Sequence, residues 1–96
     1  MTTSIKAIGL NFREGQEELI SKKLERIHYA ESLIVDLSVH VKEEKKFIFE
    51  STVHFRWGAQ VHVASDDYDF EAALNKLVDV LDQKVKKEKE KIQEKK

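Results

Sequence analysis

Three histidines come closest, in type and spacing, to a metal site in this chain. His40, His54 and His62 fall on one face of neighbouring predicted strands, and three imidazoles on one surface are a common ligand set for zinc. Histidines on a solvated sheet are more often ordinary polar side chains, and Asp36 and Glu50 offer cross-strand partners for them. We therefore predict no metal and no cofactor.

An acidic run precedes the last helical pattern of the chain. Asp66, Asp67 and Asp69 could attract Mg²⁺, but the run lacks the glycine turn and the ligand spacing of a calcium loop. Acidic residues at the start of a helix cap its free N–H groups and favour its dipole. The run is therefore predicted to cap a helix.

Residues with catalytic chemistry are sparse. The chain has no cysteine, no glycine-rich phosphate loop and no G-x-S-x-G sequence. Ser38 and His40 lie two residues apart on one predicted strand, with no evident acid to orient the histidine. We predict that the protein is not an enzyme and has no small-molecule substrate.

Basic side chains on two predicted helices are stronger candidates for a binding site. They could neutralise RNA phosphates, which would make binding sensitive to salt. The alternative is that lysines near helix C-termini only suit the helix dipole, and that mixed Lys/Glu faces are ordinary solvated surface. The candidate set is Lys22, Lys23, Arg26, Lys84, Lys86, Lys87, Lys89 and Lys91, with Lys6 and Arg56 as additions on the sheet.

Length and composition indicate one small domain. The chain has 96 residues, of which 41% are hydrophobic, and its net charge is −1. No apolar run is long enough for a signal peptide or a membrane span, so we expect a cytoplasmic protein that does not bind membranes. We also expect the protein to be a monomer when it is not bound to its partner. The domain is expected to cover residues 1–91, with a frayed lysine-rich tail over residues 92–96.

The hydrophobic pattern predicts the order β-α-β-β-β-α. Strands are indicated by alternation of apolar and polar residues, and helices by an apolar stripe with helical period. The expected elements are a strand over 4–10, a helix over 13–29, strands over 33–42, 47–57 and 60–64, and a helix from about Asp67 to beyond Lys87. This order predicts an α/β two-layer sandwich: a four-stranded sheet with two parallel helices on one face. Acidic helix starts would then gather at one end and basic finishes at the other.

Alternation within the strands also predicts which side chains are buried. In the second strand the inward residues are expected to be Leu33, Val35, Leu37, Val39 and Val41. The aromatic residues expected in the core are Phe47, Phe49, Phe55 and Trp57. Tyr29 and Tyr68, near the ends of elements, are the aromatic side chains expected to be exposed and able to stack on a base.

The last helix carries a resemblance to a known family. Residues 69–81 read Asp-Phe-Glu-Ala-Ala-Leu-Asn-Lys-Leu-Val-Asp-Val-Leu, and residues 84–89 read Lys-Val-Lys-Lys-Glu-Lys. This register resembles the short ribosome hibernation promoting factors and the ribosome-associated translation inhibitors. Lys23 and Arg26 also match that family's pair of basic residues ahead of a hydrophobic position, Ile27.

The resemblance implies a function and a partner. It implies a factor that binds the small ribosomal subunit in the channel used by mRNA and tRNA, and that inhibits translation in idle ribosomes. It favours Lys23, Arg26 and Lys87 as contacts to rRNA. The chain departs from the family's pattern at three positions of the last helix, which are Glu71, Val80 and Gln83.

A second hypothesis comes from another class of protein. The open face of the predicted sheet could bind a transcription or signalling factor, which would make the chain a regulatory protein–protein module. This hypothesis predicts that His54, Arg56 and His62 on the sheet matter more than the helix lysines, and that binding depends weakly on salt.

Overall fold

Three antiparallel strands follow from the alternating pattern in the middle of the chain. The computed structural model describes the backbone of residues 1–94 and the side chains of residues 1–91. Strand β2 (Ile34–Glu44) turns into β3 (Lys46–Phe55) and β3 turns into β4 (Gln60–Asp67). Lys45 makes the first turn in the left-handed region, and Gly58 has the same conformation in the second.

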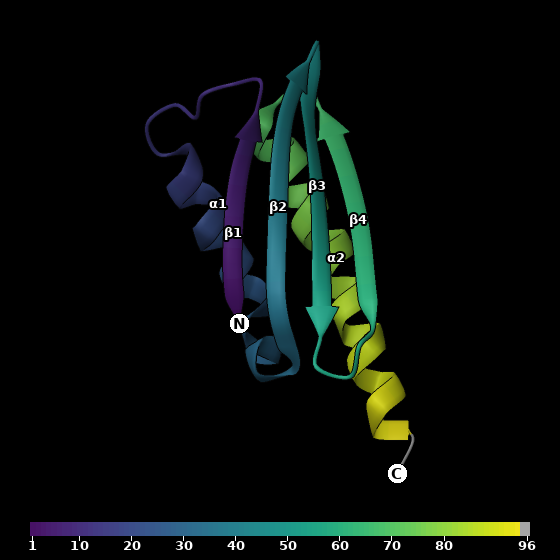
Figure 1. Cartoon of the computed structure of the whole chain (residues 1–96). Helices are drawn as coiled ribbons and strands as arrows, with labels where there is room; N and C mark the ends of the chain where they lie inside the picture. Colours follow the sequence, from purple (N-terminus) through teal and green to yellow (C-terminus); the bar gives the residue numbers. More distant parts are fainter. Residues whose placement is uncertain (95–96) are drawn as a thin grey trace.

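The N-terminal strand β1 (Thr2–Ile8) completes the sheet at the edge next to β2. It runs parallel to β2, with Thr2 opposite Asp36 and Ile8 opposite Lys42. The strand order is β1-β2-β3-β4, and the β2–β3 and β3–β4 pairs are antiparallel (Figure 1). The predicted topology, including the parallel first crossover, is confirmed.

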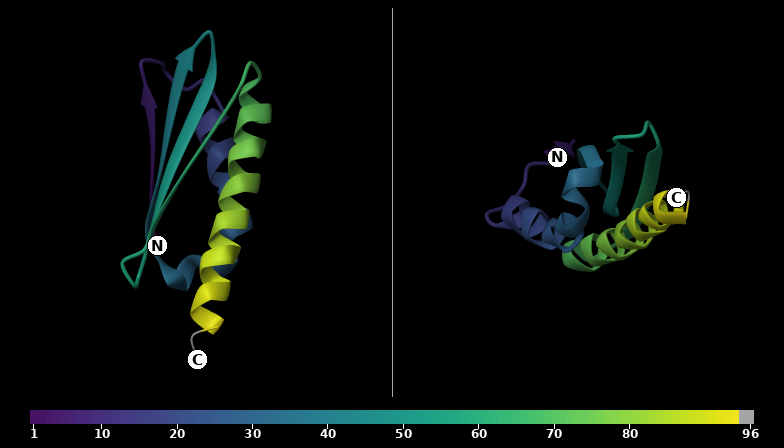
Figure 2. Two further views of the ribbon diagram at one scale, coloured as in Figure 1. Left: turned by 90° about the vertical axis from the view of Figure 1, so that its right-hand side faces the viewer. Right: turned by 90° about the horizontal axis from the view of Figure 1, so that it is seen from below.

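Two parallel helical segments cover one face of this sheet. The first comprises α1 (Gln16–Leu24) and a 3₁₀-helix η1 (Glu25–Leu33), and the second is α2 (Phe70–Glu94). Both run from the same end of the sheet toward the other, so the molecule has two layers (Figures 1 and 2). The predicted α/β sandwich with two helices on one face is therefore confirmed.

The first helix is shorter than its sequence pattern predicts. Gly15 precedes α1 with a φ of 83°, so a turn over residues 13–16 replaces the expected first helical turn. Beyond Leu24, apolar residues recur every third position, at Ile27, Ala30 and Leu33. A 3₁₀-helix has three residues per turn and places these side chains on one inward face.

The core lies between the sheet and the helices. Its members are almost fully buried and come from all of these elements except β1; they include Ile20, Ile27, Val39, Phe49, Val53, Leu74, Leu77, Leu81 and Val85. Asp69 caps α2 by accepting a hydrogen bond from the backbone N–H of Ala72 (3.0 Å), as predicted for the acidic run. Asp67 accepts a further bond from Lys76 (2.8 Å), which holds the β4–α2 turn.

Two predicted core positions are wrong. A register irregularity at the start of β2 reverses the alternation there, so Ile34 is buried and Val35 is 51% exposed. Trp57 lies just beyond β3, where it stacks on Phe55 with ring centroids 4.9 Å apart and is 38% exposed. Its indole N–H donates to Glu88 of α2 at 3.4 Å.

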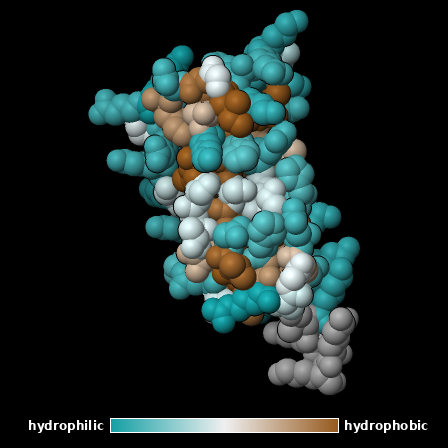
Figure 3. Space-filling model, in the orientation of Figure 1, coloured by the Kyte–Doolittle hydropathy of each residue, from teal (hydrophilic) through white to brown (hydrophobic). Residues whose placement is uncertain are grey.

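The other face of the sheet is open to solvent within the described residues. Figure 3 shows it as a mixture of polar side chains and small apolar patches. His54 pairs with Asp36 (2.9 Å), as the cross-strand hypothesis expects, and His62 bonds to the Thr52 hydroxyl (2.9 Å). The described residues contain no group of three potential ligands close enough for a metal, and none of their helices is long and apolar enough to cross a membrane.

The last residues that the structure describes belong to α2. Backbone helix continues through Glu94, and residues 95–96 lie outside the described part of the structure. The expectation of a frayed tail over residues 92–96 therefore stays a prediction, as does the boundary of the domain at residue 91.

Candidate nucleic-acid interface

Most basic residues of the two helical segments lie on two surfaces on either side of α2, while Lys22 and Lys23 line a groove beside the first of these surfaces. One is the η1–α2 seam, defined by Arg26, Tyr29, Asp82, Lys86 and Lys89. The other is the β4-side groove, whose cations are Lys84, Lys87 and Lys91. The two surfaces differ in how far protein acids already neutralise their cations.

Asp82 organises the seam. Its side chain is only 7% exposed, and its carboxylate accepts a hydrogen bond from the Tyr29 hydroxyl at 2.7 Å. The Lys86 ammonium lies 3.3 Å from it and the Arg26 guanidinium 3.6 Å. Burial raises the pKa of Asp82, but these three partners outweigh it and hold the pKa below its ordinary value. The carboxylate is therefore charged at neutral pH.

The position of Tyr29 follows from the 3₁₀ geometry of η1. Residues three apart are eclipsed in such a helix, so Arg26 and Tyr29 share one side and both reach Asp82. Burial and the hydrogen bond to Asp82 raise the pKa of the Tyr29 hydroxyl. The Lys89 ammonium lies over the ring, 5.5 Å from its centroid.

Arg26 is bound by a second acid as well. Its guanidinium donates to the carboxylate of Asp79, and this hydrogen bond is the largest reason that the pKa of Arg26 is raised. Both side chains are about half exposed, so the pair adds little to stability. Its effect is electrostatic: Asp79 offsets part of the charge of Arg26.

A groove between α1 and α2 adjoins the seam. It has a volume of about 450 Å³ and an apolar floor that includes Leu19 and Val78. Lys22, Lys23 and Arg26 line one side, while Glu71 and Asn75 line the other. Among residues 1–91, Lys22 and Lys23 form no ion pair with a carboxylate, so their charges are available to an anion.

The β4-side groove is about 310 Å³ in volume and lies between β4 and the last turns of α2. Lys91 is 3.4 Å from Glu88, which also accepts the bond from Trp57. Lys84 and Lys87 make no ion pair with any carboxylate in the part of the chain whose side chains are described. We call a lysine without such an ion pair uncommitted. This groove therefore presents two uncommitted lysines on the same side of one helix.

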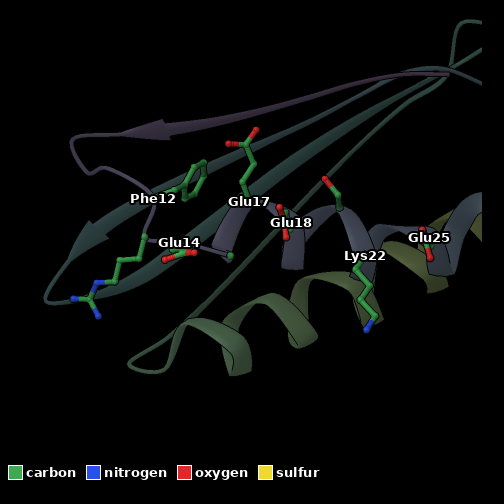
Figure 4. Close-up of a pocket in the computed structure, with 9 residues that line it drawn as sticks. Phe12, Glu14, Glu17, Glu18, Lys22 and Glu25 are labelled. Carbon is green, nitrogen blue, oxygen red and sulfur yellow. The ribbon is translucent and has the colours of Figure 1, made fainter.

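A third hollow, of about 640 Å³, lies over α1 and is unsuited to phosphate. Arg13 and Lys22 line it beside four glutamates, as Figure 4 shows for most of these side chains; the acids are Glu14, Glu17, Glu18 and Glu25. A phosphate in this hollow would face an excess of negative charge. The volume of a hollow is thus a poor guide to the binding surface in this molecule.

The structure brings most of the predicted basic residues to the helix layer but not all of them. Lys6 lies on the open face of the sheet, opposite His40 of β2, and Arg56 follows the end of β3. These two do not join either helical surface. Sequence reasoning missed Asp79 and Asp82, whose spacing of three residues on α2 was the available signal that both face the first helical segment.

The sequence matches one protein family along almost its whole length. The family is described as "Sigma 54 modulation protein / S30EA ribosomal protein", and the match covers residues 3–93. The chain belongs to this family, which includes the ribosome hibernation promoting factors predicted from the last helix. No curated protein sequence matches the chain significantly.

Solved structures with the same fold include two that match almost the whole of this chain. A ribosomal subunit interface protein from Coxiella burnetii is 22% identical with a TM-score of 0.84, and the match covers 93% of this chain and 98% of that one. The N-terminal domain of Protein Y from Thermus thermophilus is 25% identical with a TM-score of 0.78, covering 91% and 98%.

Proposed function

We propose that the protein is a ribosome hibernation factor. It binds the small ribosomal subunit in the channel used by mRNA and tRNA, and occupies it so that idle ribosomes do not translate. Membership of the S30EA ribosomal protein family supports this proposal, as do fold relatives described as a subunit interface protein and as Protein Y. Such a factor would act in the cytoplasm and be a monomer away from the ribosome.

The observation that carries the proposal is the set of uncommitted lysines on the helix layer. Lys22, Lys23, Lys84 and Lys87 make no ion pair within the described side chains, and they line grooves beside parallel helices. Cations of this kind bind phosphate oxygens and release counterions from the RNA. Binding by occupancy needs no catalytic group, only cations placed to meet the RNA backbone.

Co-sedimentation with ribosomes through a sucrose gradient, at low and at moderate salt, tests the proposal. The wild-type protein should migrate with the small subunit or intact ribosomes, and less so at moderate salt. The triple variant Lys23→Glu, Arg26→Glu, Lys87→Glu should stay at the top of the gradient while remaining folded by circular dichroism. Absence of the wild-type protein from every ribosomal fraction at low salt would contradict the function.

A matched control separates specific contacts from net charge. The variant Arg13→Glu, Lys42→Glu, Lys45→Glu makes the same change in net charge at the other end of the molecule, near the start of α1 and the β2–β3 turn. It should co-sediment as the wild type does. If the first triple variant co-sediments as well as this control, the assignment of the rRNA-binding residues is wrong.

A second candidate function is supported by the other half of the family's description. "Sigma 54 modulation protein" names an action on a transcription factor, which agrees with a regulatory module that binds through the open sheet face. In that case Ala substitutions at His54, Arg56 and His62 would abolish partner binding, and the helix lysines would not matter. Salt would then have a small effect on the complex.

A further inference from the structure

The ring of Tyr29 is both exposed and held in place. The residue is 45% exposed, although its hydroxyl donates to the buried carboxylate of Asp82 at 2.7 Å. A tyrosine that is anchored at its hydroxyl has lost much of its side-chain freedom before any partner binds. Its exposed surface is therefore a pre-organised aromatic platform on the η1–α2 seam.

Two lysines lie beside this platform. Tyr29, Lys86, Lys89 and Glu90 line a hollow of about 350 Å³ at the seam. The Lys89 ammonium lies 5.5 Å from the ring centroid and, within the described side chains, makes no ion pair with a carboxylate. An exposed aromatic ring beside an unpaired lysine suits the binding of an unpaired nucleotide, because the base can stack on the ring while the lysine meets its phosphate.

We propose that Tyr29 is a stacking platform for one unpaired RNA nucleotide, whose phosphate is bound by Lys89 with Lys86 beside it. The inference rests on the proposed function, because it names the kind of RNA structure that the η1–α2 seam selects. Duplex RNA keeps its bases stacked inside the helix and offers the seam only its backbone. An unpaired residue in a loop, bulge or strand end offers both a free base and a phosphate.

Lys89 has to leave the ring when the base arrives. A cation over an exposed aromatic ring gains less than a base that stacks on it, so the exchange is favourable. The displaced ammonium stays within reach of the same hollow and is free to bind the phosphate. Lys86 remains 3.3 Å from Asp82 and contributes less, since that carboxylate already offsets its charge.

Fluorescence anisotropy with labelled RNA tests the proposal. The probes are an unstructured single strand of roughly ten nucleotides and a duplex of the same length. A length of about ten nucleotides is within the range of site sizes of domains that bind single strands. We expect Tyr29→Leu to weaken binding of the single strand about tenfold and to leave binding of the duplex unchanged. Tyr29→Phe keeps the ring and should retain most of the affinity, which separates stacking from loss of the hydroxyl.

The other exposed tyrosine is the matched control. Tyr68 is 78% exposed and lies between β4 and α2, at the opposite end of the molecule from η1. Tyr68→Leu should bind both RNAs as the wild type does. For Lys89→Gln, the plot of log single-strand affinity against log salt should become less steep by about 0.7, which corresponds to one phosphate contact.

Three results would overturn the proposal. They are unchanged single-strand affinity in Tyr29→Leu, an equal loss for single strand and duplex, and no binding of the single strand by the wild type. None of them bears on co-sedimentation of the wild-type protein with ribosomes, so failure of the platform and failure of the proposed function are distinguishable. Circular dichroism spectra confirm that each variant is folded.

Discussion

The η1–α2 seam and the β4-side groove carry similar numbers of cations but use them differently. In the seam, Asp79 and Asp82 hold Arg26, and Asp82 also holds Lys86 and Tyr29. In the β4-side groove Lys84 and Lys87 are uncommitted. Cations bound to protein acids have a fixed geometry but little free charge, whereas uncommitted lysines attract phosphate and adopt many rotamers. The comparison shows that a count of basic residues overstates the charge available to RNA.

Removing the charge of Asp82 should have the largest effect, and it tests whether the seam is organised by one buried acid. We expect Asp82→Asn to lower the free energy of unfolding at neutral pH by about 1–3 kcal/mol, because hydrogen bonds to a charged group are lost. Urea denaturation measures this difference. Asp79→Asn is the matched control, and its exposed pair should change stability by less than about 1 kcal/mol.

The stabilisation that Asp82 provides depends on pH. The pKa of Asp82 is lower in the folded protein than its ordinary value of 3.8. Its stabilising contribution is therefore complete above about pH 4 and is lost as the pH falls through the folded pKa. The gap between wild type and Asp82→Asn should close at acidic pH. A gap that persists there would mean that the carboxylate is not the stabilising group.

Salt dependence compares the two surfaces directly and gives the next largest effect. Lys87→Gln removes an uncommitted charge. The plot of log ribosome affinity against log salt should therefore become less steep by roughly 0.7–0.9, which corresponds to one phosphate contact. Lys86→Gln removes a charge that Asp82 already offsets, so its slope should change less. Equal changes in the two variants would contradict the distinction between bound and uncommitted cations.

The smallest expected effect is a gain in ribosome affinity. Asp79→Asn removes one of the two acids that hold Arg26, which leaves the guanidinium freer to meet a phosphate. Because exposed ion pairs are worth up to about 1 kcal/mol, we expect ribosome affinity to rise by no more than about fivefold. Asp66→Asn, which releases Lys46 at the far end of the molecule, is the control and should show no gain. Unchanged affinity in Asp79→Asn would mean that Arg26 does not contact RNA.

The sequence predicted the fold more fully than the site, for physical reasons that particular residues show. Alternation and helical period reflect burial, so strand order, helix direction and most of the core were accessible. Ile34 and Val35 exchanged faces because a register irregularity depends on pairing with β3, which no local pattern reports. The sequence contains Gly15 and a three-residue period of apolar side chains after Leu24. An α-helical period fits the same apolar residues, so these signals did not distinguish a turn and a 3₁₀-helix from one longer α-helix.

The binding site was harder to predict than the fold, because the sequence does not show which basic residues form ion pairs with which acids. Lys23, Arg26 and Lys87 were equivalent in the sequence, whereas in the structure Arg26 is bound to Asp79 and the two lysines are not. The 53 residues that separate Arg26 from Asp79 are brought together only by packing of the two helical segments. Tyr29 was expected to be exposed, and the contact that holds it is of the same long-range kind.

The parallel pairing of β1 with β2 affects the order in which the chain folds. Strands β2, β3 and β4 are joined by short turns, so their pairing closes small loops at low entropic cost. β1 ends at Ile8, and β2, with which it pairs, begins at Ile34, after the whole first helical segment. Such distant contacts form late in folding. We therefore expect β1 to be the last of the four strands to dock.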